Sequence, residues 1–242
     1  MFFEMLKYRL NPKNRHDIKL QKELYAELKK FGFNFHDHRQ FNCCTFKEKD
    51  KQVVPVLIRY IDRFESEGCQ MQYLSALGVK GFNDATEYLI SKYKHYLRPE
   101  YNQMNLNVVS QTLAKICDLR FLDDYFEILS DDVTIDACYL VQMLGKLKVE
   151  TAIPYLIKLL DCVNIIPEKW ERTVLENGKY YVSQCAIEAL GKFKKKELNK
   201  HIEKFLNPSD LQWINFSDFK ESKNLLKSTY KEYIKAAQKA MC

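Results

Sequence analysis

The sequence repeats itself, and this repeat limits the chain to few folds. Four segments align without gaps on anchor residues Gly78, Cys117, Gly145 and Gly191. Apolar residues stand four and one before each anchor and, apart from Asp124, seven and eleven after it. Offsets of 7, 11 and 14–15 mark one face of a helix. Each segment therefore predicts a helix, a turn and a second helix, and a glycine anchor is expected to end the first helix as its C-cap.

The repeat predicts a stack of helical pairs. Neither helix of a pair hides its apolar stripe alone, so neighbouring pairs must bury a shared core. The anchors lie 39, 28 and 46 residues apart, which fits a base period near 28 with insertions at roughly 95–105 and 163–181. A partial unit at 53–61 aligns with 152–160, and both place a proline, Pro55 or Pro154, in the first turn of a helix.

Two segments carry a family resemblance. The Ala-Leu-Gly-Lys-x-Lys pattern at 189–194 and Ala-Ile-Pro-Tyr-Leu-Ile-Lys-Leu-Leu at 152–160 resemble HEAT-like repeats, especially the short subtype first described in phycobilisome lyases. The resemblance covers about 53–206. It implies an α-α superhelix that usually serves as a protein–protein scaffold. Some similar proteins beside bacterial toxins act as immunity proteins, a minority bind DNA, and one family of DNA-repair glycosylases is built from similar units. The catalytic pocket of those glycosylases needs a Trp/Asp/Arg cluster, whereas Trp170 and Trp213 fall outside the repeat helices.

The expected fold is all-α: one right-handed HEAT-like superhelix of four to five helical pairs with a small β-hairpin insertion. Only 7 glycines and 6 prolines among 242 residues favour long helices with short joints. We expect a single domain over 1–242, with an N-terminal capping region at 1–50, repeats at 51–206 and a C-terminal capping helix within 207–242. An amphipathic helix at 16–31, with Phe31 on its apolar face, belongs to the N-terminal cap.

The insertion at about 163–183 predicts a hairpin. Asn177-Gly178 stands between β-branched and aromatic residues, the strongest short hairpin signal. Its aromatic and cationic side chains suit interfaces and nucleic acid alike, and the candidate binding residues there are Trp170, Arg172, Lys179 and Tyr180. The alternative is an insertion tolerated in a surface loop.

A second candidate site lies on the second helices, which line the concave side in superhelices of this kind. Positions ten and thirteen after each anchor, with one residue of the partial unit, form a strip in which Tyr and Lys/Arg dominate. Its candidate binding residues are Arg59, Tyr88, Tyr155, Lys158, His201 and Lys204. An ordinary solvated face is the alternative for any one of them.

Charge supplies a third candidate. The net charge of +6 is uneven, because residues 1–31 carry +4, residues 192–242 carry +6 and the middle carries −4. Lysines recur every four residues from Lys223 to Lys239, and Lys194-Lys195-Lys196 lies nearby. Such a basic end can track phosphates or simply keep a cap soluble.

No catalytic signature occurs: the sequence lacks the phosphate-loop, dinucleotide, zinc-protease and serine-elbow motifs. His36-Asp37-His38 suits a solvated turn better than a metal site, and Asp123-Asp124 suits the start of a helix. We expect no cofactor, no metal, no membrane span and a cytoplasmic chain with reduced cysteines. The expected function is a non-enzymatic scaffold, regulatory or immunity-type binder of another protein, acting through the concave face and hairpin. DNA or other nucleic-acid binding is the alternative.

Overall fold

A computed structural model describes residues 14–98, 103–130, 135–161, 182–206 and 223–242. The all-α class is confirmed, since these residues form helices and turns and no strand is found among them. Residues 163–181 of the predicted hairpin at about 163–183 lie outside the described residues, and Val182 and Ser183 begin helix α12 instead. The chain divides into two compact units, Met1–Phe121 and Leu122–Cys242, which we call unit 1 and unit 2.

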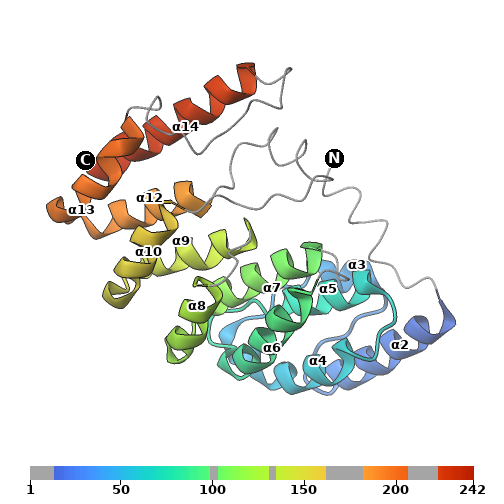
Figure 1. Ribbon diagram of the computed structural model, residues 1–242. Helices are drawn as coiled ribbons and strands as arrows, with labels where there is room; N and C mark the ends of the chain where they lie inside the picture. The colour runs from blue at the N-terminus through green and yellow to red at the C-terminus, as the bar shows by residue number, and fades with distance from the viewer. Residues whose placement is uncertain (1–13, 99–102, 131–134, 162–181, 207–222) are drawn as a thin grey trace. The chain divides into compact units, whose positions relative to one another are not determined.

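In unit 1, helices α4 and α7 each pack against two other helices. Helix α4 packs against α2 and α5, whereas α7 packs against α5 and α6 (Figure 1). Its helices are α2 (Arg15–Lys29), α3 (His38–Cys43), α4 (Val54–Ile61), α5 (Glu67–Ala76), α6 (Thr86–Tyr96) and α7 (Gln103–Ile116). Helices α5 and α7 are first helices of the repeat, and α4 and α6 are second helices. Pro55 lies in the first turn of α4, as predicted.

A buried carboxylate ties α2 to the start of α5. Asp17 is fully buried, and its two oxygens accept hydrogen bonds from the backbone N–H groups of Glu65, at 2.9 Å, and Ser66, at 3.0 Å. The prediction for Phe31 was wrong: α2 ends at Lys29 and Phe31 is 39% exposed. Gly32 causes this, because its φ of +90° turns the chain away directly after the helix.

Unit 2 is built on a row of three first helices. Helix α12 packs against α9 on one side and α14 on the other, as Figure 1 shows from yellow to red. The second helix α10 packs on α12, and α13 packs on α14. The bounds are α8 (Leu122–Ile128), α9 (Cys138–Leu147), α10 (Ile153–Leu159), α12 (Val182–Phe193), α13 (Lys196–Ile202) and α14 (Lys223–Met241). Pro154 opens α10 and Asp123 lies in the first turn of α8, as predicted.

Two glycine anchors are packing residues. Gly145 lies inside α9 and Gly191 inside α12, so the prediction that they end these helices was wrong. A Cβ placed on Gly145 would lie 2.5 Å from Cα of Ala189, and one on Gly191 would lie 2.5 Å from Cα of Ala240. Only glycine permits such close helix contact, since real side chains would overlap.

The helices end instead at a left-handed residue three positions later. Lys148 has φ 52° and Lys194 has φ 55°. The N–H of Lys148 donates to the carbonyl of Gly145, and the next N–H donates to that of Leu144, which is a Schellman ending. In unit 1, α7 also ends at a left-handed residue, the anchor Cys117 with φ 59°, whereas the left-handed Gly81 lies beyond the end of α5.

Helix α14 docks as another first helix would. If Cys242 is taken as the anchor of α14, the residues 2, 5, 6 and 9 positions before it are Ala240, Ala237, Ala236 and Tyr233. Ala240 contacts Gly191 of α12, and the other three are buried. The corresponding positions of α12 are all buried: Ala189, Ala186, Cys185 and Val182.

The opposite face of α14 differs from that of α12. Positions 4 and 7 before the anchor are buried in α12, as Ile187 and Gln184. In α14 the same positions are Gln238 and Lys235, and both are exposed. Polar side chains at positions that elsewhere receive the next helix are what a capping helix requires. The predicted capping role of α14 stays a prediction.

Candidate binding surface

The unit 1 members of the predicted strip are held by acids of the preceding helix. Arg59 on α4 pairs with Glu27 on α2 at 3.0 Å, and the neighbouring Tyr60 donates its hydroxyl to Glu27 at 2.8 Å. Tyr88 on α6 donates its hydroxyl to Asp62, which follows α4, at 2.9 Å. Burial, followed by the charge of Asp62, raises the pKa of the Tyr88 hydroxyl. Both strip residues therefore already have partners within the fold.

Lys92 completes this arrangement, and the sequence did not single it out. Its Nζ lies 5.6 Å from the ring centre of Tyr88 and 5.7 Å from that of Tyr96, and it forms an ion pair with Asp62. Its side chain is only 16% exposed. A lysine held between two aromatic faces and a carboxylate is fixed in place, so this part of the strip is internal support.

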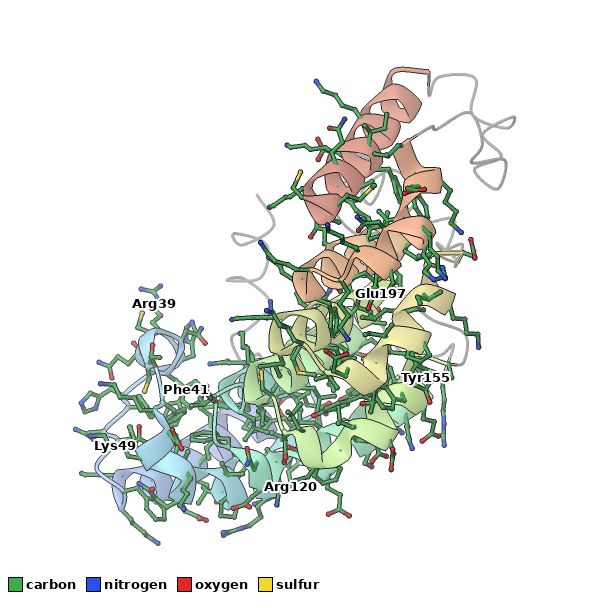
Figure 2. All side chains as sticks on the ribbon, turned by 90° about the vertical axis from the view of Figure 1, so that its left-hand side faces the viewer. Arg39, Phe41, Lys49, Arg120, Tyr155 and Glu197 are labelled. Carbon is green, nitrogen blue, oxygen red and sulfur yellow. The ribbon has the colours of Figure 1, made fainter. Side chains whose placement is uncertain are left out.

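The unit 2 members include a prepared aromatic surface. The half-buried ring of Tyr155 on α10 stacks on Phe126 of α8, with ring centres 4.3 Å apart and planes inclined by 8°. The stack fixes the ring, and Figure 2 labels Tyr155 at the edge of unit 2. The Tyr155 hydroxyl forms no hydrogen bond to any described residue, in contrast to Tyr88. Tyr155 therefore has an oriented ring and an unused polar group.

Two lysines and a histidine belong to the same candidate strip in unit 2. Lys158, one turn further along α10, is exposed and donates to the carbonyl of Ser130 at 3.4 Å. Lys204 follows α13, is exposed and pairs with Asp161 at the end of α10. His201, on α13 and one turn before Lys204, is half-buried. The structure therefore keeps all four unit 2 candidates at least partly accessible.

A common rule underlies both units: a side chain of one second helix reaches back to the second helix before it. The pairs are Arg59 with Glu27, Tyr88 and Lys92 with Asp62, Lys158 with Ser130, and Lys204 with Asp161. Of these, the ion pairs Arg59–Glu27 and Lys204–Asp161, whose basic side chains are exposed, each stabilise by only about 0–1 kcal/mol. They order the surface more than they stabilise the fold, and a partner can replace them at little cost.

The other four candidate residues cannot be compared with the strip. Trp170, Arg172, Lys179 and Tyr180 lie outside the described residues. The structure places Tyr155 and Lys158 on α10, and His201 and Lys204 on or directly after α13, with the Lys204–Asp161 pair as a link between the two parts. Arg59 and Tyr88 lie in unit 1.

An aromatic cluster in unit 1 was missed by the sequence analysis. Phe41 on α3 is buried at its centre, 5.9 Å from Tyr25 and 4.9 Å from Tyr73 between ring centres. Figure 2 shows Phe41 within unit 1, with Arg39 and Lys49 at its outer surface. Phe33, Phe35 and Phe46 complete the cluster. The available signal was the density of phenylalanines between residues 31 and 46. The cluster fixes residues 33–46 on α2 and α5 through Tyr25 and Tyr73.

The acidic and cysteine residues considered earlier have structural places. Asp37 accepts hydrogen bonds from the N–H groups of Arg39 and Gln40, each at 2.9 Å, and so caps α3. Cys138 and Cys185 are buried in unit 2. Within the described ranges, no group of three or more His, Cys, Asp or Glu side chains is placed to hold a metal ion.

Comparison of the sequence with models of protein families and with curated proteins finds no match. Among the helices that the structure describes, none is both long and apolar enough to cross a membrane.

Proposed function

We propose that this chain is a HEAT-like repeat protein that binds another protein through the exposed side of α10 and α13. The surface consists of Tyr155, Lys158, His201 and Lys204, which we call the α10–α13 surface. The resemblance of its repeats to HEAT-like scaffolds supports this role, and the expected arrangement of the whole chain is a superhelix.

The Tyr155–Phe126 stack carries the proposal. Binding energy at protein interfaces concentrates in a few residues, with Tyr, Trp and Arg enriched among them. A tyrosine whose ring is already fixed loses little conformational entropy on binding. Its unused hydroxyl can form a new hydrogen bond without breaking an existing one. Tyr155 has all of these properties, and no other strip tyrosine combines them within the described residues.

The flanking cations set the chemistry of the partner. Lys158 follows Tyr155 by one turn of α10, and Lys204 pairs with Asp161, which follows α10. The present partners of these lysines are a carbonyl at 3.4 Å and the exposed carboxylate of Asp161. A partner that presents an apolar centre with an acidic rim satisfies both the ring and the lysines. Such a partner makes the chain a scaffold, regulator or immunity-type binder.

The test is affinity capture from the source cells with nuclease present, comparing the native chain with Tyr155→Ala. A protein retained stoichiometrically by the native chain and at least about tenfold less by Tyr155→Ala supports the proposal, since a buried aromatic anchor contributes about 2 kcal/mol or more. Tyr88→Ala is the matched control, because Tyr88 is a strip tyrosine in unit 1, and it should retain the partner. Equal retention by the native chain and Tyr155→Ala would refute the role of this surface.

A further inference from the structure

Exposed lysines gather where the first helices of unit 2 end. Gly145 contacts Ala189 and Gly191 contacts Ala240, so the C-terminal ends of α9, α12 and α14 lie side by side. Parallel helices in contact stand about 8–10 Å apart. The lysines at these ends are Lys146, Lys148, Lys192, Lys194, Lys195, Lys196 and Lys239, which we call the lysine edge.

Most of these charges are unused in the fold. Lys195 pairs with Glu150. The six others are exposed and form no hydrogen bond or ion pair with a described residue. Glu188 and Glu197 are the further acids nearby in the sequence of α12 and α13. The edge therefore carries a surplus of positive charge available to a partner.

Two lysines occupy positions that local energetics gives to glycine. Lys148 and Lys194 end α9 and α12 with a left-handed backbone, with φ of 52° and 55°, as Cys117 ends α7 with φ 59°. L-residues are disfavoured in this conformation by Cβ contact with the backbone. Lysine appears there twice, and strained positions of this kind point to a function for the side chain.

Lys195 and Lys196 also lie where local helix energetics disfavours a lysine. Lys195 is the N-cap of α13 and Lys196 its first residue. The N-terminal end of a helix carries partial positive charge, which disfavours cations. Lys146 and Lys192, in contrast, lie in the last turns of α9 and α12, where cations are favoured. Stabilisation of the helix ends thus accounts for Lys146 and Lys192 but not for Lys195 or Lys196.

We infer that the lysine edge binds the phosphate backbone of nucleic acid without reading its sequence. A linear series of lysines on successive helices matches a linear polyanion with regularly spaced charges. Lysine acts as a mobile point charge and gives no base-edge selectivity here. An acidic protein surface fits less well, since a protein interface needs an apolar centre, and among the described residues of the edge only Leu147, 41% exposed, contributes a large exposed apolar side chain.

The test is fluorescence anisotropy with a duplex DNA of about 20 base pairs at about 50 to 200 mM KCl. The variant is K146Q/K148Q/K192Q/K194Q. The control K22Q/K29Q/K30Q/K49Q removes the same charge from lysines of unit 1 that are exposed and form no ion pair with a described residue. The edge variant is expected to bind at least about tenfold more weakly than the control at low salt. The slope of log affinity against log salt should become less steep by about 3–4, because each lost phosphate contact removes about 0.9.

A second variant separates binding from folding. K148G/K194G removes two edge charges and also the left-handed strain, so it should raise the melting temperature while weakening duplex binding. Equal losses in the edge and control variants, or no duplex binding at low salt, would overturn the inference. So would binding of polyglutamate or phosphatidylserine vesicles that exceeds duplex binding. Tyr155→Ala should bind the duplex normally, so failure of this inference and failure of the α10–α13 surface are distinguishable.

Discussion

Gly145 and Ala189 mark the closest approach of α9 and α12. A Cβ on Gly145 would lie 2.5 Å from both Cα and Cβ of Ala189. The same relation joins Gly191 to Ala240 at the next contact in the row. In each case the anchor of one repeat contacts the residue two before the anchor of the next. Repetition of one glycine–alanine contact thus builds the row of first helices in unit 2.

Gly145→Ala should destabilise unit 2 by about 2–3 kcal/mol, because the backbone of Ala189 must move to admit a methyl group. Chemical denaturation followed by circular dichroism measures this change in the free energy of unfolding. Gly78→Ala is the control: its new Cβ would lie 3.1 Å from both the flexible Cδ of Lys115 and the carbonyl oxygen of Ser75, with no contact as short as the 2.5 Å at Gly145. We expect it to change stability by less than about 1 kcal/mol. Equal costs in the two variants would contradict the packing role of Gly145.

Lys148→Gly should stabilise the protein by about 0.5–1 kcal/mol. Relief of left-handed strain gains about 1–2 kcal/mol, and the greater freedom of glycine in the unfolded chain offsets about 0.5–1 kcal/mol of it. Lys146→Gly, two residues earlier and inside α9, should instead cost about 1 kcal/mol. The opposite signs of the two changes in melting temperature are the result to look for. Destabilisation by both would mean that the left-handed turn is not strained.

Asp118 should make part of the stability depend on pH. Its buried carboxylate accepts a hydrogen bond from Nη2 of Arg120 at 2.7 Å and one from the Thr86 hydroxyl at 3.2 Å. The hydrogen bond from Arg120 lowers the pKa of Asp118. The folded state therefore favours the ionised carboxylate more than the unfolded chain does. Its contribution is complete above the ordinary aspartate pKa of about 4 and is lost as pH falls through the lower folded pKa.

Asp118→Asn should accordingly cost about 1.5–3 kcal/mol at neutral pH. The difference from the native chain should shrink when unfolding is measured at about pH 3. Asp123→Asn, an exposed substitution in the first turn of α8, is the control for general effects of acid. A difference between Asp118→Asn and the native chain that is the same at both pH values would contradict this account.

Tyr233 should hold α14 in place through its hydroxyl as well as its ring. It is fully buried, and its hydroxyl shares a hydrogen bond of 2.5 Å with the Ser183 hydroxyl of α12. Tyr233→Phe leaves Ser183 without this bond and should cost about 1–2 kcal/mol. Tyr155→Phe, whose lost hydroxyl has no partner among the described residues, should cost less than about 0.5 kcal/mol. Thermal unfolding of the two variants compares them directly, and equal costs would mean that the Ser183 bond adds nothing.

The sequence predicted the helical pairs well because their signal is periodic. Apolar positions four before and one before an anchor must face the core in every repeat, and Pro55 and Pro154 can start a helix but not continue one. The exposed side of α14 was also readable, since Lys231, Lys235 and Lys239 recur along it at intervals of four residues. The regular spacing of apolar residues shows which side of each helix is buried, and the repeats share this pattern of burial.

The sequence failed where tertiary contact overrides local preference. Glycine commonly ends a helix, so Gly145 and Gly191 were expected to do so. The close approach of Ala189 and Ala240 decides their role instead, and those partners lie 44 and 49 residues away. The true endings, Lys148 and Lys194, carry no local signal, because lysine is a poor residue for a left-handed turn. The sequence also could not show which strip residues have partners within the fold, because those partners lie on or directly after the preceding helix. Glu27 pairs with Arg59, and Asp62 accepts a hydrogen bond from Tyr88.

The most direct measurement of the proposed function is hydrogen–deuterium exchange of the chain with and without its captured protein partner. The account predicts slower exchange in α10 and α13, with α2 and α4 unchanged, and predicts that Tyr155→Ala abolishes the difference. Protection confined to unit 1, or protection of α10 and α13 that survives Tyr155→Ala unchanged, would contradict binding through the α10–α13 surface.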